Sequence, residues 1–282
     1  MAWAMNTQSK IIPPHIQATG NRIDRPQRGN ISENTRSYEF LGMTFQPLTR
    51  EQTVERAMWV TAQHGFRYIV TPNVDHVVNT PRAAEDFKPA FSSAWLSVCD
   101  SRILELLAKF VGIPLHAVPG SDLTRNIIEN IRDSDTPVTM IVGNEKVARI
   151  TAEKYGLSNI AVHVPPMGLR QNREAIEACA KFMSDNPARY HFICVGSPQQ
   201  EMIAKAALDR GDCTGLGFCV GASLDFLAGF QSRAPKWMQR SRLEWLYRLC
   251  KEPKRMWRRY LIDGPSVFLI YAKWIVTSRK AK

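Results

Sequence analysis

Residues 137–164 read PVTMIVGNEKVARITAEKYGLSNIAVHV, which is an apolar run, a run with helical spacing and a second apolar run. The two outer runs are short and rich in β-branched residues, as buried strands are. Two strands joined by a helix are the unit of a parallel sheet, because a parallel pair needs a long crossover connection. This stretch therefore predicts an α/β fold.

The same alternation continues on both sides of this stretch. The predicted strands are FRYIV (66–70), AWLSVC (94–99), PVTMIVG (137–143), IAVHV (160–164) and YHFICVG (190–196). Helical runs follow them, and the clearest are SRILELLAKFVG, NEKVARITAEKYG and SPQQEMIAKAAL. The pattern predicts a mostly parallel sheet with helices on both of its faces.

The composition divides the chain into three parts. Residues 1–37 are polar and carry no sustained period, so we predict a flexible N-terminal tail. Residues 38–232 carry the strand and helix alternation and form the expected catalytic domain. Residues 233–282 hold 14 Lys and Arg against 3 Asp and Glu, a net charge of +11, which equals the net charge of the whole chain. The excess positive charge is therefore confined to the last part of the chain.

A basic segment of this kind attracts polyanions, which include nucleic acid, anionic lipid headgroups and diphosphates. Within it, LEWLYRLCKEPKRMWRRYLI (243–262) repeats apolar residues every three to four positions, and Pro253 predicts a break between two helices. One interpretation is a helical hairpin packed on its own domain. The aromatic residues beside the charges favour an amphipathic segment that associates with an anionic membrane. They are Trp245, Tyr247, Trp257 and Tyr260.

Two further observations concern the compartment. The N-terminus has no apolar signal core, and the longest apolar run, VFLIYAKWIV (267–276), is shorter than the roughly 20 residues that a spanning helix needs. The six cysteines follow no metal-binding or disulfide spacing, so we expect free thiols, most of them buried. We therefore predict a cytoplasmic protein.

In a parallel sheet, ligands bind beyond the carboxyl ends of the strands. The loops at these ends contain Gly143, Asn144 and Gly196, where a diphosphate could approach the backbone and a helix N-terminus. Gln200 and Glu201 follow in the same loop as Gly196. All five are candidate substrate-binding residues.

Carboxylates occur at both ends of the predicted strands. Asp100 follows AWLSVC directly, and spacing alone favours a helix N-cap over a catalytic base there. Asp133 and Asp135 form an Asp-x-Asp pattern of the kind that holds Mn²⁺ or Mg²⁺ on nucleotide sugars, but they precede a strand. They would lie at the wrong edge of the sheet, so we predict no metal site.

Several segments resemble the WecG/TagA/CpsF glycosyltransferases in order and spacing. They are TPNVDHVV, VGIPLHAVPGSDL, VGSPQQE and GASLDFLAGFQSRAPKWMQRSRLEWLYRLCKEPKRMWRRY. The resemblance spans roughly residues 40–262, and its last segment is far too specific to arise by chance.

The resemblance implies a Rossmann-like domain that performs an inverting, metal-independent transfer without a cofactor. It also implies a C-terminal appendage that binds the inner face of the cell membrane and completes the active site. The implied donor is a UDP-sugar, and the implied acceptor is a sugar on undecaprenyl diphosphate. The products would serve exopolysaccharide, teichoic acid linkage or common antigen synthesis.

The resemblance also assigns individual residues. Asp100 matches the proposed general base, and Thr71 and Asn73 match the catalytic loop. Gln200 matches the glutamine of the Pro-x-Gln-Glu loop. Arg248, Arg255 and Arg258 match the appendage arginines that would stabilise the leaving diphosphate. The family usually has Asp-Gly at the base, whereas this chain has Asp100-Ser101.

One alternative of another class is a non-enzymatic protein that binds nucleic acid through the basic segment. It is disfavoured because the rest of the chain is neutral and carries no nucleic-acid motif. The sequence leaves open which sugar is transferred and whether the chain forms a homo-oligomer.

Overall fold

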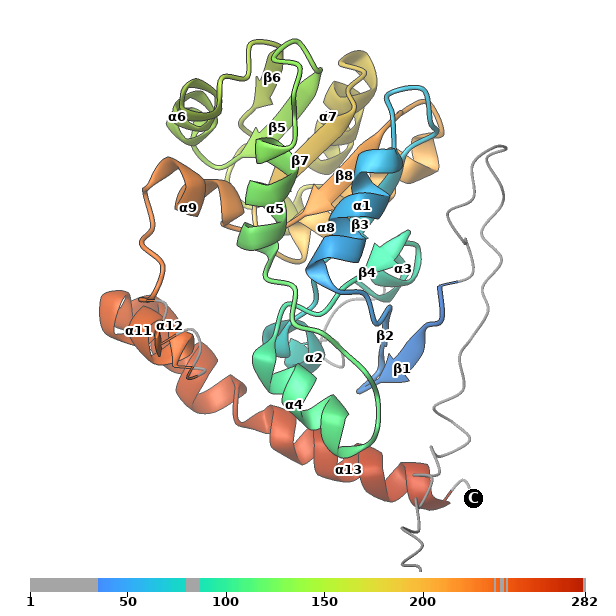
Figure 1. The fold of residues 1–282 in the computed structure, drawn as a ribbon, viewed down its shortest axis with the longest axis vertical. Helices are drawn as coiled ribbons and strands as arrows, with labels where there is room; N and C mark the ends of the chain where they lie inside the picture. The colour runs from blue at the N-terminus through green and yellow to red at the C-terminus, as the bar shows by residue number, and fades with distance from the viewer. Residues whose placement is uncertain (1–34, 80–86, 236, 239–240, 242, 281–282) are drawn as a thin grey trace, which may run out of the picture.

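The structure, a computed structural model, describes residues 35–79, 87–235, 237–238, 241 and 243–280. Figure 1 places a sheet and its covering helices in the upper part of the view and a second group of helices in the lower part. That second group continues to the C-terminal end of the described chain. The predicted tail, residues 1–37, lies outside the described residues except for 35–37.

Within the described residues, six parallel strands form one sheet in the order β4-β3-β8-β7-β5-β6. Their bounds are β3 Arg67–Val70, β4 Leu96–Ser97, β5 Val138–Val142, β6 Ile160–His163, β7 Tyr190–Cys194 and β8 Leu216–Cys219. Parallel pairing throughout confirms the predicted α/β class. The strand predicted over 94–99 is shorter than expected, because only two of its residues pair as a strand.

Strand β8 was not predicted, although it lies in the middle of the sheet. It pairs with β3 on one side and with β7 on the other, so it joins the two halves of the sheet. The sequence of β8 does not resemble a strand, because Gly215 and Gly217 interrupt the apolar run. Both glycines have a packing reason: a Cβ atom would lie 2.1 Å from the Ala188 carbonyl oxygen at Gly215 and 2.8 Å from the Phe66 ring at Gly217.

Helices cover both faces of the sheet, as predicted. Alternate strand residues such as Ile69, Met140 and Phe192 form one apolar cluster with α1 Arg50–Trp59, α5 Gly120–Glu129, α6 Glu145–Tyr155 and α9 Ser223–Ala228. The opposite residues, such as Tyr68 and Ile193, form another with α3 Phe87–Ser92, α7 Arg173–Asp185 and α8 Gln199–Arg210. A short 3-10 helix, Leu169–Gln171, precedes α7.

A third apolar cluster lies apart from the two faces of the sheet. It is built by an antiparallel hairpin, two helices that follow strand ends, and the last helix of the described chain. These elements are β1 Tyr38–Phe40, β2 Met43–Phe45, α2 Val74–Asn79, α4 Arg102–Phe110 and α13 Ser266–Lys280. Val267 of α13 is only 1% exposed in this cluster, and the Trp274 ring meets the Phe40 ring edge to face at 5.3 Å.

The C-terminal segment therefore has two parts. Its first part contains α11 Glu244–Lys251, α12 Pro253–Trp257 and the π-helix η3 Arg258–Asp263. Pro253 occupies the first position of α12, which confirms the predicted break between two helices. Its second part, α13, packs into the third cluster. Because α13 lies beyond residues 243–262, its packing tests neither interpretation of that stretch, and association with a membrane stays a prediction.

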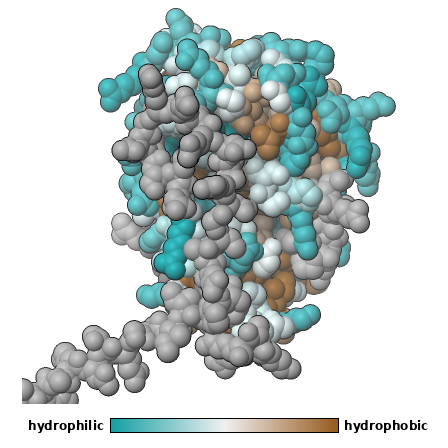
Figure 2. Space-filling view, turned by 90° about the vertical axis from the view of Figure 1, so that its right-hand side faces the viewer, coloured by the Kyte–Doolittle hydropathy of each residue, from teal (hydrophilic) through white to brown (hydrophobic). Residues whose placement is uncertain are grey.

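The surface of the C-terminal segment carries large exposed apolar side chains. They are Trp237, Trp257, Leu261, Ile262, Phe268, Leu269 and Val276. On another side of the molecule, Figure 2 shows hydrophilic residues over much of the described surface, with smaller hydrophobic patches between them. Among the described helices, none has the length and apolar character that crossing a bilayer requires.

Candidate active site

The ends of β3 and β4 bring Asp100 beside the loop that contains Thr71. Backbone pairing continues past both strands, because the Val98 amide donates to Val70 O at 3.0 Å and the Asp100 amide donates to Pro72 O at 2.8 Å. The carboxyl ends of neighbouring parallel strands thus place these two loops together, as we predicted from their positions in the sequence.

Asp100 is not the N-cap of the helix that follows it. Ser101 takes that position, and its hydroxyl accepts a hydrogen bond from the Leu104 amide at 3.2 Å. The preference for a capping Asp100 on spacing alone was therefore wrong, because the next residue supplies the cap. The Asp100 carboxyl group remains available for other contacts.

The surroundings of Asp100 change its acidity. Burial raises the pKa of Asp100 to about 7, and the negative charge of Glu244 acts in the same direction. Three groups oppose this shift: the backbone amide of Gly120, which donates to the carboxylate, and the positive charges of Arg248 and His76. Gly120 begins α5, so the positive end of a helix points at Asp100. A carboxyl group with a pKa near neutrality is suited to accept a proton.

Arg248, in the C-terminal segment, lies close enough to Asp100 for its positive charge to lower the pKa of that carboxyl group. Its guanidinium donates to Glu244 at 2.7 Å within α11 and lies over the Phe226 ring of α9 at 5.1 Å. Burial lowers the pKa of Arg248, but the negative charges around it, with Glu244 foremost, outweigh burial, and the pKa is raised. The structure thus brings one of the three predicted arginines to the predicted base.

The other two predicted arginines differ from Arg248. Arg258 lies in η3 with 76% of its side chain exposed, and its Nε is 3.9 Å from Asp263. The backbone of Arg255 belongs to α12, whereas its side chain lies outside the described part of the protein. Arg259, which was not predicted, has its Nε 3.7 Å from an oxygen of Asp75 in α2.

Thr71 and Asn73 organise the loop after β3. The buried Thr71 hydroxyl donates to Cys219 O at 3.1 Å and so connects the ends of β3 and β8. The Asn73 side-chain oxygen accepts from the Asp75 amide at 3.0 Å in the first turn of α2. Both residues lie in the loop that pairs with Asp100, and their catalytic role stays a prediction.

Gln200 and Glu201 lie at the start of α8, beneath the ends of β7 and β8. Gln200 is 3% exposed, and its side-chain oxygen accepts from the Gly221 amide at 2.8 Å. Its amide group donates to Glu201 at 2.6 Å, and Glu201 is completely buried. Both side chains are therefore engaged inside the protein.

Gly196 and Gly143 follow β7 and β5, further along the same edge of the sheet. Gly196 has a φ of +83°, and a Cβ atom at either glycine would meet nothing within 4 Å. The Asn144 side chain caps α6 by accepting from the Lys146 amide at 3.0 Å. These residues leave open space at the carboxyl edge, but they lie apart from Asp100, because β8 and β7 stand between β3 and β5.

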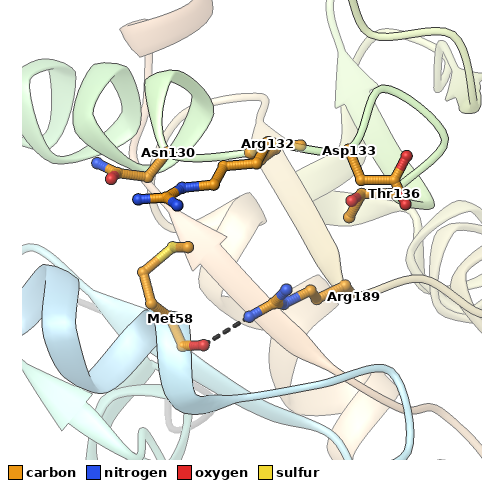
Figure 3. A pocket seen from close by; sticks show the side chains of 7 residues that line it. Met58, Asn130, Arg132, Asp133, Thr136 and Arg189 are labelled. Atoms are coloured by element: carbon orange, nitrogen blue, oxygen red, sulfur yellow. Dashed lines mark hydrogen bonds between the residues drawn. The ribbon is translucent and has the colours of Figure 1, made fainter.

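The Asp-x-Asp pattern lies at the opposite edge of the sheet. Asp133 accepts from the Asp135 amide at 3.0 Å in a local turn, and Asp135 accepts from the Ser158 hydroxyl at 2.7 Å and so joins the loops before β5 and β6. Asp133 also lines a pocket of about 440 Å³ with Arg132 and Arg189 (Figure 3). The Arg189 guanidinium donates to Met58 O at this edge. The pattern is thus far from Asp100, as its position before a strand predicted.

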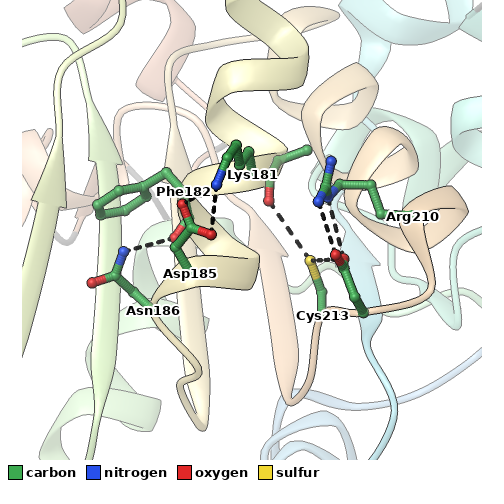
Figure 4. Close-up of polar contacts among 8 residues, drawn as sticks. Lys181, Phe182, Asp185, Asn186, Arg210 and Cys213 are labelled. Carbon is green, nitrogen blue, oxygen red and sulfur yellow. Dashed lines mark hydrogen bonds and ion pairs between the residues drawn. The ribbon is translucent and has the colours of Figure 1, made fainter.

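The cysteines are free thiols, as predicted. Cys99, Cys179, Cys194, Cys213 and Cys219 are buried, and Cys250 is exposed. Cys213 lies at the amino edge between the ends of α7 and α8, where its sulfur contacts Ala180 O (Figure 4). The ion pairs Lys181–Asp185 and Arg210–Asp212 border it. Burial raises the pKa of Cys213 to about 11, which keeps this thiol protonated and unreactive.

Two side chains near the site were missed in the sequence. His76 is buried in α2 and contributes to the charge around Asp100. Arg233, at the start of the basic segment, pairs with Asp122 in the first turn of α5. His76 lies in the segment TPNVDHVV, and Arg233 lies in the segment that begins GASLDFLAGFQSRAP. Both segments carry the family resemblance, but the sequence alone assigned no role to either residue.

The assembled edge contains a carboxyl group with a near-neutral pKa, a helix N-terminus and an arginine. Such a set can remove a proton from a hydroxyl group while positive charge stabilises an anionic leaving group. A comparison with known protein families finds the same class of chemistry: the model described as "Glycosyl transferase WecG/TagA/CpsF family" matches residues 38–281.

Proposed function

The chain belongs to the WecG/TagA/CpsF family of glycosyl transferases, and from this premise we propose that it moves a sugar from a UDP-sugar to a sugar on undecaprenyl diphosphate. The family places the chain in cell-surface polysaccharide synthesis. The donor, the acceptor and inversion at the anomeric carbon are our proposal. Family membership also favours an enzyme over the nucleic-acid-binding alternative.

The observation that carries the proposal is the position of Asp100. Asp100 lies at the carboxyl edge of the sheet and has a pKa of about 7. Because Ser101 caps α4, the Asp100 carboxyl group is not used as a helix cap. In the proposed reaction, Asp100 takes the proton of the acceptor hydroxyl. The hydroxyl oxygen then bonds to the anomeric carbon from the face opposite the diphosphate, and the bond from that carbon to the diphosphate oxygen breaks. UDP leaves with the electron pair, and the configuration is inverted.

The leaving diphosphate needs positive charge. We assign this role to Arg248, which already lies near Asp100, and to Arg255 and Arg258 on the basis of the family resemblance. A guanidinium group can contact a phosphate through two parallel hydrogen bonds. Gly143, Asn144 and Gly196 are assigned to the donor, because their loops are open at the same edge.

The lipid-linked acceptor requires the active site to lie close to a membrane. Support comes from the exposed apolar side chains of the C-terminal segment, such as Leu261 and Leu269, and from the basic residues around them. Apolar side chains enter the acyl boundary while basic residues contact anionic headgroups. We propose that this segment binds the inner face of the cell membrane and presents Asp100 to the acceptor.

The test is a screen of UDP-sugars with a short-chain prenyl-diphosphate-linked sugar, read by mass spectrometry. We expect one donor to give an acceptor heavier by one sugar, and Asp100→Asn to reduce that product by about 10² to 10⁴. Asp209→Asn is the matched control, because this exposed aspartate pairs with Lys205 on α8. Normal transfer by Asp100→Asn would reject Asp100 as the base.

Metal independence has its own test. Because Asp133 and Asp135 accept hydrogen bonds within the loops at the far edge of the sheet, we expect transfer to continue in excess EDTA. Asp133→Asn should likewise transfer at the rate of the unmodified protein. Activity that disappears with EDTA and returns with Mn²⁺ would contradict this part of the proposal.

A further inference from the structure

A buried histidine and a buried glutamate face each other beneath the loop after β3. Nε2 of His76 lies 3.8 Å from Oε1 of Glu201, and their side chains are 8% and 1% exposed. A carboxylate is costly to bury unless hydrogen bonds or an opposite charge stabilise it. The burial of Glu201 beside His76 therefore needs a functional explanation.

The contacts of the His76 ring fix where its proton lies. The Asn73 backbone amide and the Asn73 side-chain oxygen are both 3.0 Å from Nδ1. If Nδ1 accepts from the backbone amide, the neutral ring carries its proton on Nε2. The backbone amide can only donate, so Nδ1 is the accepting nitrogen in this contact. The Nε2 proton then faces Glu201 Oε1 across 3.8 Å.

Gln200 extends this pair to the next strand end. Its amide group donates to Glu201 Oε1 at 2.6 Å, and its oxygen accepts from the Gly221 amide at 2.8 Å. Polar contacts thus run from Gly221 after β8, through Gln200 and Glu201 on α8, to His76 and Asn73 after β3. The chain of contacts ends in the loop whose Pro72 carbonyl accepts from the Asp100 amide.

We propose that Glu201 and His76 are a positioning pair: Glu201 orients the His76 ring, and His76 holds Asn73 in place beside Asp100. This assignment rests on the proposed transfer reaction. It replaces direct contact of Glu201 with substrate, because Glu201 is fully buried. The pair is connected to the proposed base through the loop that contains Asn73, because the neighbouring Pro72 carbonyl accepts from the Asp100 amide.

The first test reads the His76 ring itself. In protein labelled with ¹⁵N-histidine, NMR correlations give the protonation of each ring nitrogen, and the His76 signals are those lost in His76→Gln. We expect a proton on Nε2 in the unmodified protein and a changed Nε2 signal in Glu201→Gln. His163, far away on β6, supplies the control signal and should not change. An unchanged His76 signal in Glu201→Gln would overturn the pair, whether or not transfer is detected.

The second test is kinetic. Small displacements near a reacting centre can cost up to about 10²-fold in rate, so we expect Glu201→Gln to lower kcat by about 10- to 100-fold with a smaller change in the donor KM. His76→Gln combined with Glu201→Gln should be no slower than the worse single variant. Glu201→Asp should recover part of the rate, and it also serves as the test variant if Glu201→Gln does not fold. Losses that multiply in the double variant, or a change confined to KM, would overturn the proposal.

Discussion

At the scale of single residues, the acidity of Asp100 determines how the proposed activity depends on pH. The ionised carboxylate is the base, and it predominates above a pKa of about 7. We therefore expect kcat/KM to rise about tenfold per pH unit below that value and to level off above it. Initial rates between pH 5 and pH 9 measure this profile, and a flat profile would contradict the assignment.

Replacing Arg248 tests the same rising part of the pH profile of kcat/KM. Its positive charge lowers the pKa of Asp100, so removing that charge should raise the pKa. In Arg248→Gln, we expect the rising limb to move to higher pH, in addition to any loss of rate. A lower rate without a shift of the rising part of the pH profile would show that Arg248 does not affect the pKa of Asp100.

The same shift makes a prediction for stability. The pKa of Asp100 rises from the ordinary aspartate value of 3.8 to about 7 in the folded protein, so the bound proton stabilises the fold below pH about 4. That stability is lost as the pH rises through the window from about 4 to 7, and above it the charged carboxylate is a cost. Asp100→Asn keeps the shape without the charge.

Because Asp100 is partly exposed, we expect less than the full value of this shift. Asp100→Asn should be more stable than the unmodified protein by about 1 to 2 kcal/mol at pH 8 and equally stable at pH 4. Urea unfolding at both pH values measures the difference. Asp209→Asn, at an exposed ion pair, should stay within about 0.5 kcal/mol at each pH.

At the scale of helices and strands, Ser101 has a measurable effect. Its hydroxyl caps α4, so Ser101→Ala should lower the free energy of unfolding by about 1 kcal/mol. Ser101→Gly should cost only a few tenths of a kcal/mol, because glycine is tolerated at an N-cap. Thermal unfolding of the two variants distinguishes them. Equal losses would indicate that the hydroxyl does not stabilise the helix.

The sequence predicts most helices and strands, because apolar residues recur in each of them with the spacing typical of its type. The runs around 137–164 and 190–210 match β5, α6, β6, β7 and α8 closely. Strand β8 was missed because Gly215 and Gly217 are required by tertiary packing and give no strand signal. The hairpin of β1 and β2 was missed as well, since strands of three residues are too short to show alternation.

The candidate site was predicted only in part, for a different reason. The sequence placed Asp100, Thr71 and Asn73 at strand ends, and parallel pairing brings them together. The amide of Gly120 and the charge of Arg248 come from other parts of the chain, whereas the cap by Ser101 is local and was not assigned because Asp100 was taken as the cap. No local pattern encodes these distances, so the acidity of Asp100 was not predictable.

At the scale of the whole molecule, the C-terminal segment has both a buried and an exposed apolar side. Leu261 and Leu269 are 56% and 75% exposed, so replacing both by Gln should leave the fold intact. Burying a leucine contributes about 1.5 to 3 kcal/mol, so we expect the double variant to bind anionic liposomes at least about tenfold more weakly. Liposome sedimentation measures the partition.

The matched control is Met167→Gln, because Met167 is 97% exposed in the loop after β6, away from the C-terminal segment. It should bind liposomes as the unmodified protein does. Binding by the double variant at the unmodified level would contradict a membrane contact through Leu261 and Leu269. Removing the whole segment is a poorer test, because it would strip Val267 from the third cluster and destabilise the fold.

The third cluster also has a consequence for the order of folding. Phe45 of β2 and Ser266 of α13 are about 220 residues apart in the chain, so their cluster closes a very long loop. The sheet, in contrast, grows from neighbouring strand and helix units, and contacts of short sequence separation form fastest. We expect the sheet to form before α13 docks. In native-state hydrogen exchange, the backbone amides of α13 should therefore exchange with solvent sooner than those of β7 and β8. The helix that closes the third cluster would then be the last to dock during folding and the first to detach.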